Sequence, residues 1–183
     1  LIYRDQAPEW SRLRSHLSQV CEASYLCHRE DQDFGVEAII DPGNGPLAAI
    51  HCAQQAHPEA AWLVIACDLP LLELETLQDL VSARDNSVNA VCFASAIDGL
   101  PEPLCAIYEP TIAPTIHEAI KQNKYCPRKL LTDAKLISLN QSHALMNANT
   151  KADTVEIDSL LNDTQTEKSV TLQYFAQLKD LAG

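Results

Sequence analysis

Apolar residues occur along this chain in two patterns, as unbroken runs and as runs at helical spacing. The segment from Trp62 to Cys67 is entirely apolar, which is typical of a parallel strand that is covered on both faces. Leu74, Leu77 and Leu80 then recur at helical spacing and predict a helix from Glu73 to Ala83. A buried strand followed by an amphipathic helix is the basic unit of an α/β domain.

The same two patterns alternate over most of the length. Strands are expected at residues 23–27, 36–40, 62–67, 89–95, 104–108 and 136–139, and helices at 7–20, 46–56, 73–83, 112–120 and 152–161. Pro46 suits the first turn of its helix, where a backbone N–H would have no partner. This alternation predicts an α/β fold with a mainly parallel sheet.

The last part of the chain departs from the alternation. Residues 162–168 are polar, without an apolar period, and are interpreted as a linker. Residues 170–175 form a strand-like run, and residues 176–182 a helical one. We therefore expect one α/β domain at 1–161, a linker at 162–168 and the start of a further unit at 169–183.

Composition and charge narrow the range of functions. The 183 residues suit one globular domain, and a hydrophobic content of 46% is enough for a sizeable core. The formal net charge of -12 argues against nucleic acid or an anionic membrane surface as a partner. A small anionic substrate is compatible with this charge, since a bound divalent cation reverses the local field.

Cysteine use and hydropathy predict a cytoplasmic protein. The seven cysteines are widely spaced and form no Cys-x-x-Cys pair, as expected of reduced thiols in the cytosol. No apolar run approaches the ~18 residues of a membrane span, and no signal peptide is visible. The first residue is Leu1 rather than Met, which leaves room for preceding sequence.

Two aspartates follow expected strands. Asp68 comes directly after the buried run, and ligands of open α/β sheets bind along the edge where parallel strands end. Such a carboxylate can bind Mg²⁺, or it can cap the following helix. Asp41 precedes a turn in which Gly43 and Gly45 permit close approach by a ligand. The helix that opens at Pro46 can receive polar ligand groups, or the segment is an ordinary strand-to-helix turn.

Polar and basic residues later in the chain form two further candidate sites. Asn147 and Asn149 lie two residues apart and can face one side of an extended segment, where their amide oxygens can bind a cation. Alternatively, Asn149 or Thr150 caps the helix expected after it, and the two roles can coexist. The densest cationic cluster lies at residues 121–129 and includes Arg128. It suits either a phosphate or carboxylate group of a substrate or a solvated helix face.

In their order and spacing, these segments resemble the molybdenum cofactor guanylyltransferases and related nucleotidyltransferases. The resemblance covers residues 1–161 and rests on five short motifs. These are Asp41, Gly45-Pro46-Leu47-Ala48, Cys67-Asp68-Leu69-Pro70, Pro103-Leu104-Cys105-Ala106-Ile107-Tyr108 and Asn147-Ala148-Asn149-Thr150. Each motif alone is weak evidence, whereas five in one order are fairly specific. The Asp-Leu-Pro and Gly-Pro-Leu segments resemble those of enzymes for guanylyl transfer more than those of enzymes for cytidylyl transfer.

The resemblance implies a three-layer α/β/α nucleotidyltransferase fold of Rossmann-like type. It implies an enzyme that uses Mg²⁺ to transfer GMP from GTP to molybdopterin, with release of pyrophosphate. GTP and molybdopterin would be its ligands, and other proteins of cofactor biosynthesis are candidate partners.

By position in the motifs, the resemblance assigns a role to each candidate residue. Asp68 would bind the metal. The catalytic set would be Asp68, Asn147 and Asn149. The nucleotide would be bound by Asp41, Gly45, Pro46, Leu47 and Asp68. Arg128 would lie on the molybdopterin side.

The sequence also departs from the family. The family begins with a strand and a Gly-rich loop, ending in Arg-Met-Gly and a Lys, which hold the triphosphate; neither is present, so we expect the chain by itself to be inactive. Ala49 stands where Gly is usual, and His28 and Arg29 lie where the family often has a nucleotide-contacting Asn. Residues 170–183 resemble the opening strand and helix of the small sulfur-carrier subunit of molybdopterin synthase, a β-grasp protein.

Two alternatives stay open from the sequence. One is a different nucleotidyltransferase, for cytidylyl transfer to the cofactor or for nucleotide-sugar synthesis, which base selectivity would distinguish. The other is a non-catalytic binding module or scaffold, which would show no Mg²⁺-dependent nucleotide binding.

Overall fold

A mixed sheet of seven strands forms the middle layer of the structure, a computed structural model that describes residues 7–31, 35, 37–140, 143–147, 153, 155, 157, 159 and 173–178. The strands lie in the order β2-β1-β7-β3-β5-β4-β6. Their bounds are β1 Cys21–Arg29, β2 Ala38–Asp41, β3 Trp62–Ala66, β4 Ala90–Ala94, β5 Pro101–Tyr108, β6 Lys135–Ile137 and β7 Gln173–Leu178.

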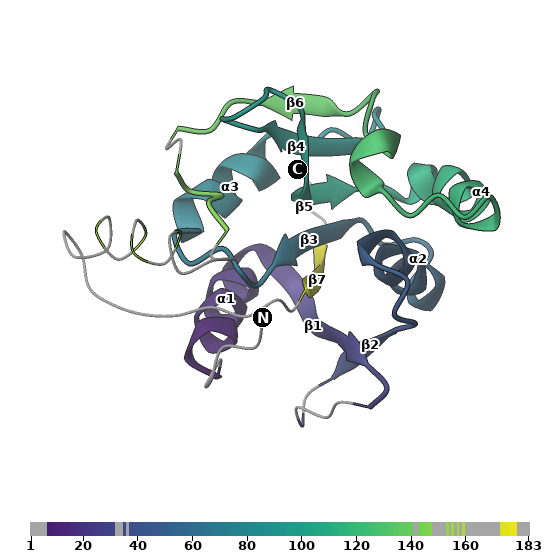
Figure 1. Ribbon diagram of the computed structural model, residues 1–183, viewed down its shortest axis with the longest axis horizontal. Coiled ribbons are helices and arrows are strands. Elements are labelled where there is room, and N and C mark those ends of the chain that lie inside the picture. Colours follow the sequence, from purple (N-terminus) through teal and green to yellow (C-terminus); the bar gives the residue numbers. More distant parts are fainter. Residues whose placement is uncertain are drawn as a thin grey trace.

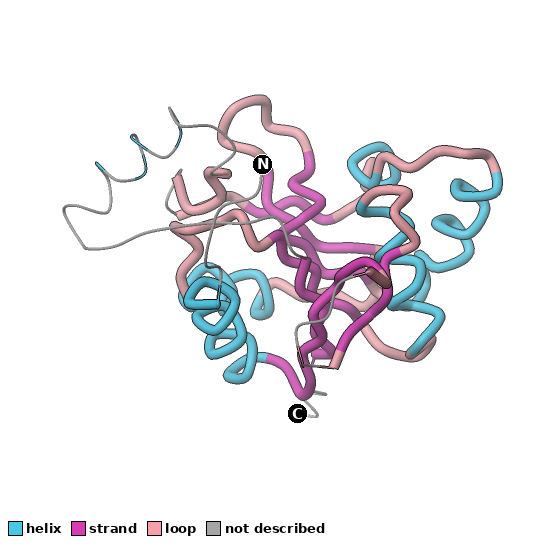
Figure 2. Tube along the Cα trace, turned by 60° about the horizontal axis from the view of Figure 1, so that its bottom comes forward, coloured by secondary structure: helices cyan, strands magenta, loops and turns pink. Residues whose placement is uncertain are grey.

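Helices cover both faces of this sheet. One face carries α1 (Ala7–Val20) and α3 (Leu74–Ser82), and the other carries α2 (Pro46–Ala56) and α4 (Ala113–Lys121) (Figure 1). Figure 2 shows the same arrangement from another direction, with helices on two sides of the strands. Short 3-10 helices occur at Pro110–Ile112 and Pro127–Leu130. The α/β class and the three layers expected from the sequence are confirmed.

The sheet is mixed: five of the seven described strands point the same way, as the prediction of a mainly parallel sheet implies, but four of the six neighbouring pairs are antiparallel. β1 is parallel to β2, and β4 is parallel to β6. β7 runs antiparallel to β1 and β3, and β5 runs antiparallel to β3 and β4. It follows that β1, β2, β3, β4 and β6 all point the same way, while β5 and β7 point the opposite way.

The unbroken apolar run of β3 is explained by burial on both faces. Leu63 and Ile65 pack into a core cluster with residues of α1 and α3, whereas Trp62 and Val64 pack into a second cluster with residues of α2 and α4. Successive side chains of a strand point to opposite faces, so each cluster takes alternate residues. Each such side chain, fully removed from water, stabilises the fold by roughly 1.5–3 kcal/mol.

The tail contributes a central strand rather than a peripheral one. Gln173 lies opposite Cys27 of β1 on one side and Ala66 of β3 on the other. The helical run expected from residue 176 is wrong over residues 176–178, because ladder positions between two strands outweigh local helical preference there. Residues 162–168 lie outside the described part of the chain. The expectation that residues 169–183 begin a β-grasp domain stays a prediction.

Candidate functional site

The candidate residues gather at one edge of the sheet. Because β1, β2, β3, β4 and β6 point the same way, their carboxyl ends lie along a common edge. Asp41 is the last residue of β2 and Arg29 the last of β1. Asp68 follows the end of β3 at Ala66, and Ser95 follows β4. This is the edge along which open α/β sheets bind ligands.

Asp68 is a buried carboxylate with an unpaired oxygen. Its residue surface is only 5% exposed, and Oδ1 is buried without a hydrogen-bond partner. Desolvation by burial raises its pKa, against a smaller lowering by a backbone hydrogen bond within the residue. An orphaned buried acceptor costs free energy and is rare in proteins. A cation bound at Oδ1 would remove this cost.

The alternative role of Asp68, as a helix cap, is not what the structure contains. The N-cap residue of α3 is Glu73, and no side chain caps that helix. Four residues therefore separate Asp68 from the cap position. The carboxylate therefore has no role in starting α3, and ligand binding by Asp68 stays a prediction.

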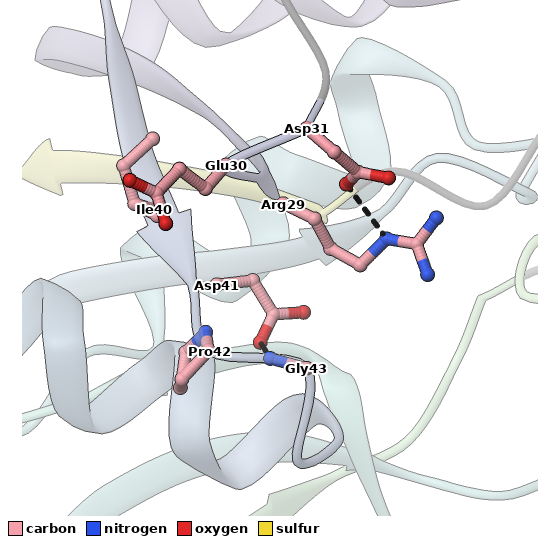
Figure 3. A pocket seen from close by; sticks show the side chains of 7 residues that line it. All are labelled: Arg29, Glu30, Asp31, Ile40, Asp41, Pro42 and Gly43. Atoms are coloured by element: carbon pink, nitrogen blue, oxygen red, sulfur yellow. Dashed lines mark hydrogen bonds and ion pairs between the residues drawn. The ribbon is translucent and has the colours of Figure 1, made fainter.

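A cavity of about 590 Å³ opens beside Asp41 (Figure 3). It is lined by Arg29, Glu30, Asp31, Ile40, Asp41, Pro42 and Gly43. The Oδ1 atom of Asp41 accepts a hydrogen bond from the Gly43 N–H at 2.8 Å, and Arg29 Nε lies 3.4 Å from Asp31 Oδ1. A ligand in this cavity would therefore meet one cation and several carboxylates.

The N-terminus of α2 follows this cavity in the chain. Gly45 occupies the N-cap position with φ 87°, a conformation that favours glycine, and no side chain caps the helix. Pro46 is at the start of the helix, as expected. The side chain of Leu47 is fully buried in the core, so only its backbone can face a ligand.

A second cavity, of about 360 Å³, brings Arg128 and Asn147 together. Its other lining residues are Ser95, Ala96, Ile97, Glu102, Leu139, Leu145, Met146 and Asp153. Arg128 is paired with two carboxylates, at 3.1 Å from Asp98 Oδ2 and 3.2 Å from Glu102 Oε2. Asn149 lies outside the described residues.

The candidate site has three parts: the cavity beside Asp41, the Asp68 carboxylate and the cavity that contains Arg128. They lie side by side along the sheet edge rather than in one pocket. Two strands, β1 and β7, separate Asp41 on β2 from the end of β3, which corresponds to roughly 14 Å at the usual strand spacing. Asp68 lines neither cavity described above. An extended ligand would be needed to contact all three parts.

Sequence reasoning missed several lining residues. Glu30, Asp31, Ser95 and Glu102 border the two cavities and were not among the candidates. Three of them follow strand ends, the same signal that identified Asp41, whereas Glu102 lies at the start of β5.

The part of the chain that the structure describes, residues 7–31, 35, 37–140, 143–147, 153, 155, 157, 159 and 173–178, was compared with the requirements of a metal site and of a membrane span. No three His, Cys, Asp or Glu side chains there converge as a ready-made metal site. None of the helices there is long and apolar enough to cross a membrane.

Comparisons with known proteins give a consistent result. The family model of the MobA-like NTP transferase domain matches residues 4–141. A molybdenum cofactor biosynthesis bifunctional protein of Synechocystis is 29% identical over an alignment of 167 residues, and the match covers 86% of this chain and 48% of that protein. A probable molybdenum cofactor guanylyltransferase of Flavobacterium johnsoniae is 36% identical over 104 residues, 56% of this chain and 50% of that protein. The chain thus spans about half the length of these curated relatives.

Solved structures agree on the fold. The crystal structure of molybdopterin-guanine dinucleotide biosynthesis protein A from Archaeoglobus fulgidus superposes with a TM-score of 0.57 at 22% identity, covering 72% of this chain and 71% of that one. A protein from Aquifex aeolicus gives a TM-score of 0.59 at 19% identity, covering 82% of this chain and 88% of that one. Since the family model covers most of its residues, the chain belongs to the MobA-like NTP transferase domain family.

Proposed function

We propose that the protein to which this chain belongs transfers GMP from GTP to the molybdenum cofactor, molybdopterin, and releases pyrophosphate. The family, and relatives named molybdenum cofactor guanylyltransferases, support this choice of reaction. One observation carries it: the buried, unpaired Oδ1 of Asp68 at the carboxyl edge of the sheet. A carboxylate at this edge can hold a divalent cation on the phosphates of a nucleotide.

The residues present fit Mg²⁺. It is a hard cation that takes oxygen ligands, commonly one or two carboxylates together with water and substrate phosphates. Asp68 supplies such an oxygen, which the protein leaves without a donor, and other ligands would come from GTP. When bound, the ion neutralises charge that develops on the phosphates during transfer.

Each cavity suits a different part of the reactants. The Asp41 cavity would receive the guanosine, because a carboxylate can accept hydrogen bonds from the N–H groups of guanine. The Arg128 cavity would receive molybdopterin, with Asn147 and Asn149 near its phosphate or the metal. Arg128 carries five N–H donors in a fork, so it can keep its carboxylate partners and still face a phosphate.

The chemical step then needs little covalent participation by the protein. An oxygen of the molybdopterin phosphate attacks the α-phosphorus of GTP, and the bond from that phosphorus to the bridging oxygen of the β-phosphate breaks. The electron pair leaves with pyrophosphate. The residues named above hold the two reactants in line, and such positioning can supply several kcal/mol of the barrier reduction, about 7–11 kcal/mol in favourable cases.

Calorimetric titration with GTP, in the presence and absence of Mg²⁺, tests the proposal. It is made on this chain and on protein that includes any residues the gene encodes before it, with CTP and ATP as competitors. We expect Mg²⁺-dependent binding selective for GTP, and loss of that dependence in Asp68→Asn. The exposed Asp133→Asn serves as the matched control. Preference for CTP would favour cytidylyl transfer, and no nucleotide binding would favour a scaffold.

A further inference from the structure

The turn Leu69–Leu72, which follows Asp68, is held by hydrogen bonds from α1, a helix that is distant in sequence. Arg12 of α1 donates two hydrogen bonds to it, from Nη1 to the Leu72 carbonyl oxygen at 2.5 Å and from Nη2 to the Leu69 carbonyl oxygen at 3.2 Å. The Leu72 N–H also donates to the Leu69 carbonyl, at 3.1 Å. A four-residue turn is thereby closed by its own backbone and clamped at both ends by one guanidinium.

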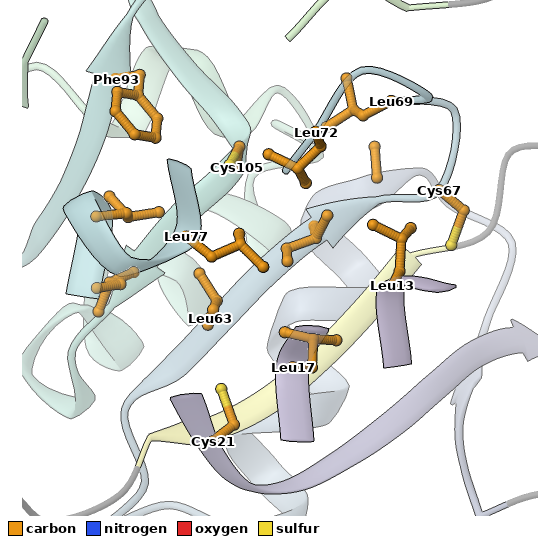
Figure 4. Packing of buried hydrophobic residues seen from close by; sticks show 14 of the residues in the cluster. Leu13, Leu17, Cys21, Leu63, Cys67, Leu69, Leu72, Leu77, Phe93 and Cys105 are labelled. Atoms are coloured by element: carbon orange, nitrogen blue, oxygen red, sulfur yellow. The ribbon is translucent and has the colours of Figure 1, made fainter. Parts of the chain in front are cut away.

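Apolar packing holds α1 and this turn in the same place. Leu13 and Leu17 of α1 are fully buried in the cluster that also contains Leu69 and Leu72 (Figure 4). The helix therefore shares a core cluster with the turn and contacts it directly through Arg12. Because close-packed interiors deform little, this packing holds α1, and with it Arg12, in place relative to the turn.

The position of the Asp68 carboxylate depends on this clamp because no protein donor holds its Oδ1. On its N-terminal side, the backbone is fixed by the ladder of β3, where Ala66 pairs with Gln173. On its C-terminal side, the next fixed point is Leu69, the residue that Arg12 contacts. Asp68 thus lies in a short span between two anchors.

We propose that Arg12 is a positioning residue, which sets the place of the Asp68 carboxylate for divalent cation binding. The inference rests on the proposed function, in which Asp68 binds the cation. Arginine suits this task because its fork of N–H groups can reach two carbonyl oxygens at once. Partners that orient a metal ligand typically affect metal affinity by 10- to 100-fold.

The test uses Arg12→Gln, with Arg14→Gln as its matched control. Arg14 is on the same helix but exposed, so its loss should change neither the turn nor the metal site. In the full protein, Mn²⁺ affinity in the presence of GTP is measured by electron paramagnetic resonance. We expect Arg12→Gln to weaken Mn²⁺ binding by about 10-fold, Arg14→Gln to leave it unchanged, and Arg12→Lys, which keeps the charge, to lie between.

A purely structural role for Arg12 gives a different result. Hydrogen exchange of the Leu72 amide should rise in Arg12→Gln and not in Arg14→Gln, whatever happens to the metal. Faster exchange with unchanged Mn²⁺ affinity would overturn the proposal. If Arg12→Gln does not fold, Arg12→Lys decides, and wild-type affinity in that variant overturns it as well.

Mn²⁺ binding by Asp68→Asn distinguishes an error in the proposed function from an error in the role of Arg12. If Asp68→Asn binds Mn²⁺ as tightly as the wild type, the metal assignment itself is wrong and the positioning role falls with it. If Asp68→Asn loses binding and Arg12→Gln keeps it, only the inference about Arg12 is wrong.

Discussion

At the scale of single residues, Asp68 is a carboxylate that the fold buries without giving its Oδ1 a donor. Its pKa is raised by desolvation. A group with a raised pKa in the folded state adds stability below its unfolded pKa of 3.8, and this contribution is lost as the pH rises through the folded value. At neutral pH without metal, the charged carboxylate therefore lowers the free energy of unfolding.

The raised pKa of Asp68 predicts how its replacement changes stability. Without divalent cations at pH 7, Asp68→Asn should raise the melting temperature, by about 2–4 °C if the gain is near 1 kcal/mol. The difference should vanish as acid protonates Asp68 in the wild type. Added Mg²⁺ with GTP should stabilise the wild type and not the variant, because a ligand stabilises the state that binds it. Thermal melts at several pH values check this, and a lower melting temperature for the variant at pH 7 would contradict it.

A second residue-scale prediction concerns the thiols. Cys126 is exposed, while Cys21, Cys27, Cys67, Cys92 and Cys105 are buried. Burial raises the pKa of the Cys92 thiol to about 12, and the reactive species is the thiolate. In native protein at pH 8, a thiol reagent should label Cys126 quickly and the buried thiols only on unfolding. Mass spectrometry of labelled peptides gives the order, and rapid native labelling of Cys92 would be inconsistent with this packing.

The residues that could be predicted are those whose signal is local. Asp41 and Asp68 each follow an apolar run, so their place at the sheet edge could be expected from the sequence. Arg12 could not, because it contacts a carbonyl 60 residues away and nothing in its own helix indicates that turn. Contacts of this kind depend on how elements pack, which a local pattern does not contain.

At the scale of elements, local pattern was sufficient where the apolar period was strong. The helix expected at residues 7–20 has those bounds in the structure, and so has the one at 46–56. β5 begins at Pro101, three residues before its expected start. There the turn after β4 closes with a hydrogen bond from the Ser95 N–H to the Leu100 carbonyl at 2.8 Å, which sets the two strands side by side from Pro101 on.

The contact between α2 and α4 provides an element-scale prediction. His51 Nε2 and His117 Nδ1 lie 3.2 Å apart, and their rings are stacked. Burial, and then the charge of His117, lower the pKa of His51 below 6.5. His51 is therefore protonated more readily in the unfolded chain than in the folded protein. The free energy of unfolding falls as the pH drops from about 7 through the folded pKa of His51.

Replacing His51 of the His51–His117 pair should weaken the dependence of stability on pH. In urea unfolding at pH values of about 7.5 and 5.5, the wild type should lose more free energy of unfolding on acidification than His51→Gln does. His143→Gln removes a histidine elsewhere and should behave as the wild type. An equal loss in wild type and His51→Gln would show that the pair does not sense pH.

At the scale of the whole molecule, the strand order is the feature that the sequence could not supply. The apolar pattern indicates which segments are strands but not which of them pair. The described sheet would consist of two separate ladders, β2-β1 and β3-β5-β4-β6, without β7 between them. β7 also lies outside residues 4–141, the part that the family model matches. We therefore expect cooperative unfolding of the sheet to depend on a segment beyond that match.

Proline at the centre of β7 tests this dependence. Ala176 lies opposite Ser24 on β1 and Leu63 on β3, and Ala176→Pro removes an N–H from a strand paired on both sides. We expect a loss on the order of 3 kcal/mol in the free energy of unfolding. Ala176→Gly, which keeps the N–H, should lose only about 0.5–1 kcal/mol.

Urea unfolding followed in parallel by tryptophan fluorescence and far-ultraviolet circular dichroism provides the measurement. With Trp10 of α1 replaced by Phe in every variant, fluorescence reports on Trp62, which is buried in β3 in one of the two ladders, whereas circular dichroism reports on all helices and strands. In the wild type the two transitions should coincide, as expected when one cooperative unit unfolds. In Ala176→Pro they should separate, because the ladders are no longer joined through β7. If the proline variant unfolds like Ala176→Gly with coincident transitions, β7 does not connect the two halves of the sheet.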